Sequence, residues 1–350
     1  MKTYLTGLAV LALGSSGWAF QIQLDYTYDA ANGDFFGSHP AAKAALQGAA
    51  NDINALITSP LAAVTTDTFT GSSVLSTAKI DWNLSFKNPS TGADVTLDTF
   101  TMPANTVRIY VGMQALTGST LGEGGPAGAG FQYSVGGPSL GWQAAFNQAQ
   151  SASNASMGRG AGPVMGEFKD STGNPAYDLI YGSLAGNLWF DDDTNNDGVV
   201  DSDSILNSSW NFDLAGPVSG KNDFYSVALH ELLHSIGFGT SQTWTSLESG
   251  STWNGAQAKA LNGGSGLNLV AGAHLREGLM SSRLLDGAPQ EVVMDPTLLQ
   301  GTRKYLTAMD AAFLRDLGYT TVPEPGAGAL LLSSIAMLAF ARAGRGRRRA

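Results

Sequence analysis

The feature that most constrains this chain is the string HELLH at residues 230–234, continued by SIGFG. In a helix, residues four apart lie on the same face, so His230 and His234 can bind one zinc ion. Glu231, beside the first histidine, is then placed to take a proton from an attacking water. The chain has only 4 histidines, and two of them flank this glutamate. The pattern predicts a zinc peptidase rather than a buried helix with incidental histidines.

The local sequence predicts that the motif lies on a helix over residues 224–236. Asp223 is a suitable N-cap, because its carboxylate can accept hydrogen bonds from the free N–H groups of the first turn. Gly237 follows the last turn, where glycine adopts a positive φ at little cost. We therefore expect a sharp change of chain direction directly after the second histidine.

Hydrophobic periodicity predicts the elements around this helix. Alternating apolar residues predict three strands, at residues 21–28, 107–113 and 187–190. An apolar stripe predicts a helix that begins at Pro40, and the capping signature of Thr307 and Asp310 predicts a final helix that ends at Gly318. The glycine-rich segment 118–137 is expected to be a surface loop, since it lacks the lysine and the strand-to-helix context of a phosphate-binding loop.

A catalytic zinc site needs a third protein ligand. In the short form of the metzincin motif a third histidine follows three residues after the glycine, but that position holds Thr240, and a hydroxyl is a poor zinc ligand. His39 lies far upstream before a proline and is expected to be a surface or helix-entry residue. His274 is therefore the expected third ligand, with Glu248 and Glu277 as rivals that the sequence leaves open.

The spacing of these residues resembles the leishmanolysin-like metzincins, in which an insertion separates the glycine from the third histidine and a methionine turn follows. The matching residues are His230, Glu231, His234, Gly237, Phe238, His274 and Met280. The resemblance implies that Met280 provides hydrophobic support beneath the metal. Ser282 stands where some metzincins have an oxyanion-stabilising tyrosine, so the group with that role is open.

The same resemblance, which extends over residues 221–319, implies a fold class. We expect an α+β, metzincin-like zincin fold for a peptidase domain at residues 20–320. Its N-terminal lobe, to about residue 239, has a mixed twisted sheet and the active-site helix. Its loop-rich C-terminal lobe, residues 240–320, ends in a helix.

An acidic segment, DTNNDGVVD at residues 193–201, places oxygen-bearing side chains at alternate positions around a glycine. This pattern is typical of the first half of a calcium loop of the EF-hand or dockerin kind. The expected ligands are Asp193, Asn195, Asp197 and Asp201. The twelfth position is Ser204 instead of glutamate, so a solvated acidic turn is an equal alternative.

Both ends of the chain are typical of export signals. Residues 1–19 combine Lys2, an apolar stretch and small residues before Phe20, which predicts a signal peptide. Residues 322–350 combine the string VPEP, an apolar segment at 326–341 and five arginines, and resemble the PEP-CTERM sorting signal of Gram-negative bacteria. That resemblance implies an exosortase-type partner and a transient inner-membrane anchor, with an ordinary C-terminal anchor as the alternative.

The charge of the chain excludes some classes of partner. The formal net charge is −10, and it falls to −15 when the lysine near the start and the five arginines and one glutamate of the tail are left out. Such an acidic domain argues against nucleic acid as a partner. Cysteine is absent, so an exported domain would have neither disulfides nor a thiol nucleophile.

Together these observations predict an exported or cell-surface zinc endopeptidase that acts on proteins or peptides, with Glu231 as general base. The alternative is a non-catalytic zinc- or calcium-binding protein of the surface or the biofilm matrix.

Overall fold

The computed structural model describes residues 20–65, 69–138, 140–169 and 177–323. The expected signal peptide at residues 1–19 and the apolar segment at 326–341 lie outside this part of the chain. Among the described residues, no helix combines the length and the apolar character needed to cross a membrane.

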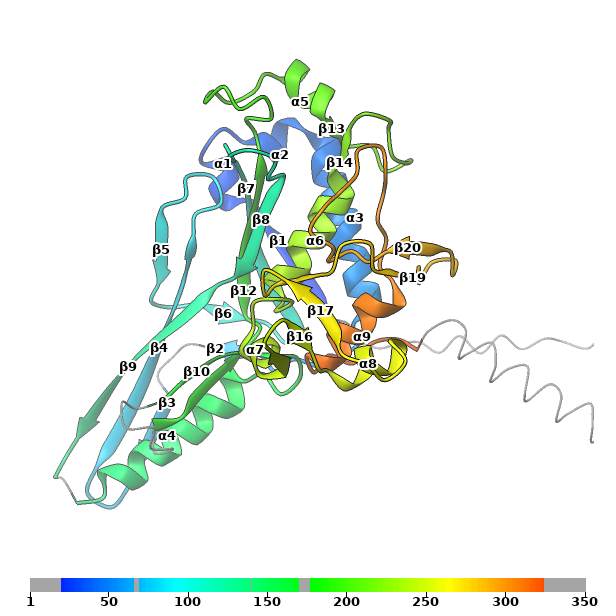
Figure 1. Cartoon of the computed structure of the whole chain (residues 1–350). Helices are drawn as coiled ribbons and strands as arrows, with labels where there is room; N and C mark the ends of the chain where they lie inside the picture. The colour runs from blue at the N-terminus through cyan, green and yellow to red at the C-terminus, as the bar shows by residue number, and fades with distance from the viewer. Residues whose placement is uncertain (1–19, 66–68, 139, 170–176, 324–350) are drawn as a thin grey trace, which may run out of the picture.

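A four-stranded mixed sheet forms the centre of the body (Figure 1). Its strand order is β1 (Gln21–Asp25), β7 (Thr106–Gln114), β12 (Ala185–Asp191) and β8 (Gly122–Pro126). β1 and β12 run parallel to β7, whereas β8 pairs antiparallel with β12. The expectation of an α+β chain with a mixed sheet is confirmed, and so are the strands predicted around residues 107–113 and 187–190.

Two long helices pack side by side against this sheet. α3 (Pro40–Leu56) contacts β1, and α6 (Phe224–Ser235) contacts β12 and β8. α3 buries one face, as its apolar stripe predicts. Every residue of α6 except His230 is buried, because α6 packs on both the sheet and α3. The helix that carries the motif is therefore a core element with one side open at the first histidine.

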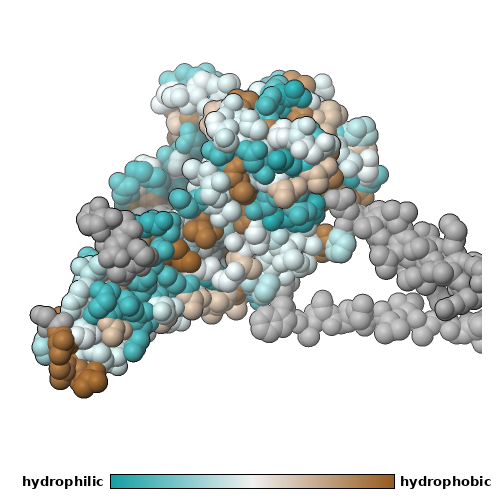
Figure 2. All heavy atoms as spheres, turned by 60° about the horizontal axis from the view of Figure 1, so that its bottom comes forward, coloured by the Kyte–Doolittle hydropathy of each residue, from teal (hydrophilic) through white to brown (hydrophobic). Residues whose placement is uncertain are grey.

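An arm projects from the body at the lower left of Figure 1. Its main strand, β4 (Thr77–Lys87), pairs with β3 (Phe69–Ser72), β5 (Asp94–Leu97) and β9 (Gly128–Gly136). Helix α4 (Trp142–Met157) packs on β3 and β4, and a second hydrophobic cluster around Trp82 and Phe146 extends to Tyr110 of β7 and Ala185 of β12. Its far end is apolar, with Val74, Leu75 and Leu140 exposed (Figure 2).

The segment after α6 is rich in loops and closes over the end of that helix. Its sheet contains β15 (Glu248–Ser249), β16 (Thr252–Trp253), β17 (Leu267–Val270) and β18 (His274–Leu275). Its helices are α7 (Gln242–Leu247), α8 (Ala256–Leu261) and α9 (Ala308–Asp316). Aromatic side chains pack this segment against the residues that follow the motif. The ring centroid of Trp244 lies 4.7 Å from that of Phe238 and 4.3 Å from that of Trp253.

The remaining elements are short. They are α1 (Thr27–Ala30), α2 (Phe35–Ser38), α5 (Asp203–Ser209), β2 (Val64–Thr65), β6 (Thr101–Met102), β10 (Val164–Phe168), β11 (Leu179–Gly182), β13 (Trp210–Asn211), β14 (Asn222–Asp223), β19 (Met280–Ser282) and β20 (Pro289–Glu291). The final helix α9 has the predicted capping box of Thr307 and Asp310, and Gly318 follows it with a φ of 99°.

Two expectations about local structure are wrong. The first strand ends at Asp25, and residues 27–30 turn into α1, because the Asp25 carboxylate accepts hydrogen bonds from both the N–H and the hydroxyl of Thr27. The glycine-rich segment 118–137 is not a surface loop: it contains β8 and β9. Its glycines let β8 approach α6 closely, since a Cβ at Gly124 would lie 2.5 Å from the carbonyl oxygen of Glu231.

This close approach leads to a prediction about Gly124. Gly124→Ala should push β8 away from α6 and lower the free energy of unfolding by about 1–3 kcal/mol, the usual cost of overpacking. Gly125→Ala is the matched control, because a Cβ there would meet no atom within 4 Å. Urea unfolding of both variants measures the difference. Equal stabilities would contradict the close packing of β8 on α6.

Candidate metal centre

The helix that carries the motif is fixed at both ends. At its start the Asp223 carboxylate accepts hydrogen bonds from the N–H and the hydroxyl of Ser226, and it pairs with Arg303 at 2.8 Å. Both members of that pair are buried, so the N-cap is held to the C-terminal part of the chain. At its end Gly237 has a φ of 112°, and the Thr240 hydroxyl donates to the carbonyl of His234 at 2.7 Å. Thr240 thus caps the helix instead of binding a metal.

A hairpin of β17 and β18 brings His274 to this helix. His274 pairs with Val270 across a turn in which Ala271 and Gly272 both have positive φ. The backbone before His274 packs directly on the chain after Gly237, since a Cβ at Gly239 would lie 2.5 Å from the carbonyl oxygen of Ala273. A glycine at residue 239 therefore lets the third histidine reach the first two.

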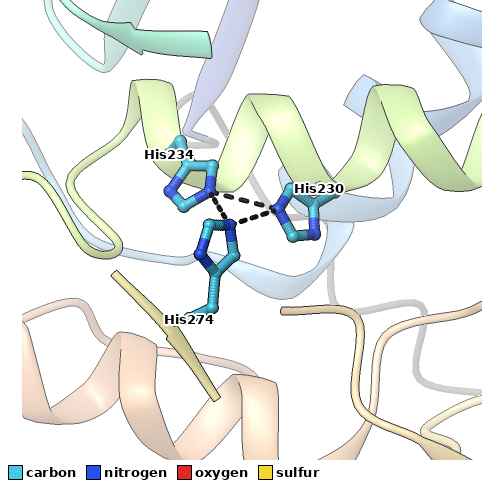
Figure 3. A group of neighbouring side chains, drawn as sticks. All are labelled: His230, His234 and His274. Atoms are coloured by element: carbon cyan, nitrogen blue, oxygen red, sulfur yellow. Dashed lines mark hydrogen bonds between the residues drawn. The ribbon is translucent and has the colours of Figure 1, made fainter. Parts of the chain in front are cut away.

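The three imidazoles converge on one point (Figure 3). The Nε2 atoms of His230 and His234 are 3.1 Å apart, and the Nε2 atom of His274 lies 3.2 Å from each. Two nitrogens at about 2.0–2.1 Å from a tetrahedral zinc ion are separated by roughly 3.3 Å. The observed triangle therefore matches three ligands of one tetrahedral ion, and all three histidines line the cleft.

The hydrogen bonds of Nδ1 in His230 and His234 determine whether Nε2 of each ring has a proton or a lone pair. Nδ1 of His230 donates to the carbonyl of Val293 at 2.9 Å, and Nδ1 of His234 donates to the carbonyl of Phe238 at 2.8 Å. A neutral imidazole has a single N–H, so both Nε2 atoms must present lone pairs. Two lone pairs 3.1 Å apart repel each other unless a cation lies between them. The donor set thus fits zinc, with the carbonyls as outer partners that orient the ligands.

Burial keeps these rings neutral. The pKa of His234 is lowered to about 4, mainly by burial and also by the neighbouring His274, against the opposing effect of the Phe238 carbonyl. Burial also lowers the pKa of His230 and of His274. Metal binding requires unprotonated imidazoles, so the three ligands are ready to bind at neutral pH.

Glu231 lies in the same cleft as the histidines, a hollow of about 860 Å³ between residues 118–124 and residues 293–298. The pKa of its carboxyl is raised to about 8, mainly by burial and also by the negative charge of Glu123, against the opposing effect of the Gly124 N–H. A bound divalent cation would favour the ionised form and lower this pKa again. Such a carboxyl is suited to accept and release a proton near neutral pH.

The two rival ligands do not join the histidines. Glu248 accepts a hydrogen bond from the indole N–H of Trp244, and Glu277 accepts one from the hydroxyl of Thr297. His39 is also remote: its ring stacks on Phe35 at the start of α3. Of the sequence-derived candidates, only His274 is brought to His230 and His234.

A second group of acidic side chains, Glu277, Glu291 and Asp295, lies close enough together to hold a cation. The buried Lys304 already forms ion pairs with two of them: its Nζ atom lies 3.5 Å from the Glu291 carboxylate and 3.6 Å from the Asp295 carboxylate.

Met280 does not lie beneath the histidines, and this expectation is wrong. Its side chain is 55% exposed on β19, where Ser282 also lies. The buried methionine next to the site is Met294, which follows the Val293 carbonyl that binds His230. Its own carbonyl accepts the N–H of Leu275, directly after His274. In the sequence, the three consecutive apolar residues at 292–294 are the pattern that indicates the burial of Met294.

The acidic segment folds as a loop whose side chains mostly bind its own backbone. Asp193 accepts N–H groups of Asp197 and Gly198, and Asp197 accepts that of Val199. In the described part of the chain, Asp193, Asp197 and Asp201 are not among the groups whose ligand atoms lie within 4.8 Å of one another. Calcium binding by the predicted set, with Asn195, stays a prediction.

We compared the chain with known proteins, and no protein-family model, no curated protein and no solved structure matches it.

The triangle of nitrogens predicts the effect of removing its third member. His274→Ala should lower zinc affinity by at least about 100-fold, more than the loss of an outer-sphere partner usually costs. His39→Ala is the control, because this histidine lies outside the site. Competition with a chromogenic zinc chelator measures both affinities, and an unchanged affinity in His274→Ala would rule out this ligand.

The environment of Glu231 predicts an unusual pH dependence of stability. The carboxyl has an ordinary pKa of 4.5 when unfolded and about 8 when folded without metal. Between these values the unfolded chain has lost a proton that the folded chain keeps, so this group makes the protein less stable as pH rises. Glu231→Gln should not lose stability in this way. Its free energy of unfolding should therefore rise relative to that of wild type by roughly 2–4 kcal/mol between pH 5 and pH 8.

Urea unfolding of the metal-free proteins at several pH values measures this difference, with the exposed Glu277→Gln variant as control. Parallel pH profiles for wild type and Glu231→Gln would contradict the burial of this carboxyl.

Proposed function

We propose that this protein is a zinc-dependent endopeptidase of the leishmanolysin-like metzincin kind. The observation that carries the proposal is the convergence of three Nε2 atoms, two of them with lone pairs fixed toward the same point, beside a buried glutamate. A metzincin-like zincin fold is part of the proposal, supported by the mixed sheet, the motif helix and the final α9.

His230, His234 and His274 would hold the zinc ion, which would supply a Lewis acid for the scissile carbonyl and for activation of water. Glu231 accepts the proton of the attacking water and passes it to the leaving amine. Burial raises the pKa of this carboxyl and a bound cation would lower it, and these opposing effects suit a group that both accepts and releases a proton. His230 and His234 keep their orientation through the Val293 and Phe238 carbonyls, so the chain supplies a preorganised site.

The free edge of β8 supports an extended peptide as the substrate. Among the described strands β8 pairs only with β12, and Gly122, Glu123 and Gly124 line the cleft beside the histidines. An unpaired strand edge offers backbone N–H and C=O groups to a peptide that adds as a further strand. Pairing of this kind would lay the peptide backbone along the cleft whatever its side chains are.

We also propose that the domain acts outside the cytoplasm, at the cell surface or in the medium of a Gram-negative bacterium. This rests on the sequence patterns at residues 1–19 and 322–350, with exosortase-type processing of the tail as the expected route.

The proposed role of Glu231 predicts a separation of zinc binding from catalysis. Glu231→Gln should retain zinc but cleave casein roughly 10²–10⁴-fold more slowly, the usual contribution of a general acid–base group. Glu277→Gln should retain both properties, because this residue lies outside the histidine site.

Cleavage of a fluorescent casein, with zinc content determined on the same samples, measures both effects. Full activity in Glu231→Gln would overturn the mechanism. Zinc in a wild type that cleaves no protein would favour the alternative, a non-catalytic surface or matrix protein.

A further inference from the structure

The acidic loop, residues 191–201, buries more negative charge than its surroundings neutralise. Four of its carboxylates are less than 10% exposed: Asp191, Asp192, Asp193 and Asp201. Within the described part of the chain none of them forms an ion pair with lysine, arginine or histidine. Burying a carboxylate without a positive partner lowers the stability of the folded protein, so a bound cation would stabilise this loop.

The hydrogen bonds of the loop show which oxygens are still free. Both oxygens of Asp193 accept backbone N–H groups, and Asp191 accepts those of Leu116 and Asp193. One oxygen of Asp201 accepts the N–H and the hydroxyl of Thr194. The Oδ1 atoms of Asp192 and Asp201 are buried and accept no hydrogen bond.

Asp192 and Asp201 are neighbours in the folded loop. The N–H of Asp201 donates to the carbonyl of Asp192 at 2.7 Å, and both residues line the same hollow with Asp29 and Gln114. Each is more than nine-tenths buried. Two residues that each have an unpartnered carboxylate oxygen thus line the same hollow.

We propose that the acidic loop binds a calcium ion through Asp192 and Asp201, and that this ion holds the rim of the substrate cleft in place. Calcium fits better than magnesium, because calcium accepts six to eight oxygens in a flexible geometry, so two loop carboxylates and waters in the hollow can form its shell, whereas magnesium demands a near-octahedral one. The ligand pair differs from the alternate-residue set that the sequence suggests, in which Asp193 and Asp197 already accept backbone N–H groups.

The loop is tied to the cleft by a short series of hydrogen bonds. Asn196 accepts the N–H of Gly118 at 2.8 Å and donates to its carbonyl at 3.1 Å. Asp191 accepts the N–H of Leu116 through its side chain and donates its own N–H to the carbonyl of Leu121. Residues 118–124 form one wall of the cleft and lead into β8. Order in the acidic loop is therefore transmitted to the strand edge beside the histidines.

The first test is titration of the zinc-loaded full chain with CaCl₂, followed by calorimetry and by thermal unfolding. Wild type should bind calcium and gain thermal stability, whereas MgCl₂ at the same concentration should give a much smaller shift. Tryptophan fluorescence gives a local signal, because the Trp210 indole donates to the carbonyl of Asp191 at 3.1 Å. Absence of any calcium effect, or an equal effect of magnesium, would overturn the proposal.

Three variants identify the ligands. Asp192→Asn and Asp201→Asn should each weaken calcium binding at least about 10-fold, since affinity follows the number of charged ligands. Both should be as stable as wild type or more stable without calcium, because each removes an unpaired buried charge. Asp197→Asn, an exposed residue of the same loop, is the matched control and should bind calcium almost normally. Equal losses in Asp197→Asn and Asp192→Asn would restore the sequence-derived set instead.

The link to the cleft has its own test. Calcium should slow hydrogen exchange of the amides in residues 118–124 of wild type. Asn196→Gly removes the side chain that binds Gly118, and since Asn196 has a φ of 57°, glycine adopts this backbone without strain. This variant should still bind calcium but lose the protection at residues 118–124. Protection that survives the substitution would show that the ion does not act through Asn196. None of these readouts depends on peptide cleavage.

Discussion

The candidate site depends on two hydrogen bonds from histidine rings to backbone carbonyls. The carbonyls of Val293 and Phe238 take the Nδ1 protons of His230 and His234, so the inner nitrogens face each other as lone pairs. That arrangement is unfavourable without a cation and favourable with one. Both carbonyls belong to segments outside α6, so the rest of the fold has to hold them in place.

The fold meets this requirement from both ends of the motif helix. The buried pair of Asp223 and Arg303 fixes the start of α6, and the turn at Gly237 brings the Phe238 carbonyl back to the helix. Gly239 then lets the backbone before His274 pack against that turn. On the opposite side, glycines in β8 let a strand edge lie directly on Glu231. The close approach of these segments to α6 thus depends on three glycines, Gly124, Gly237 and Gly239.

Much of this was predictable because it depends on local signals. The cap of α6, the apolar stripe of α3 and the capping box of α9 follow from neighbouring residues, and His274 was the best remaining histidine. The errors depend on tertiary contacts. The strands β8 and β9 are glycine-rich because of close packing, which no propensity indicates. Met280 and Met294 differ in burial, and the free oxygens of Asp192 and Asp201 emerge only after their neighbours' hydrogen bonds are known.

The central claim is that three imidazoles hold one zinc ion with a fourth position open. X-ray absorption at the zinc edge of the purified protein tests it most directly. The account predicts a shell of three imidazole nitrogens at about 2.0–2.1 Å with one further oxygen ligand. A six-oxygen shell, or a zinc ion with only two imidazoles, would contradict it.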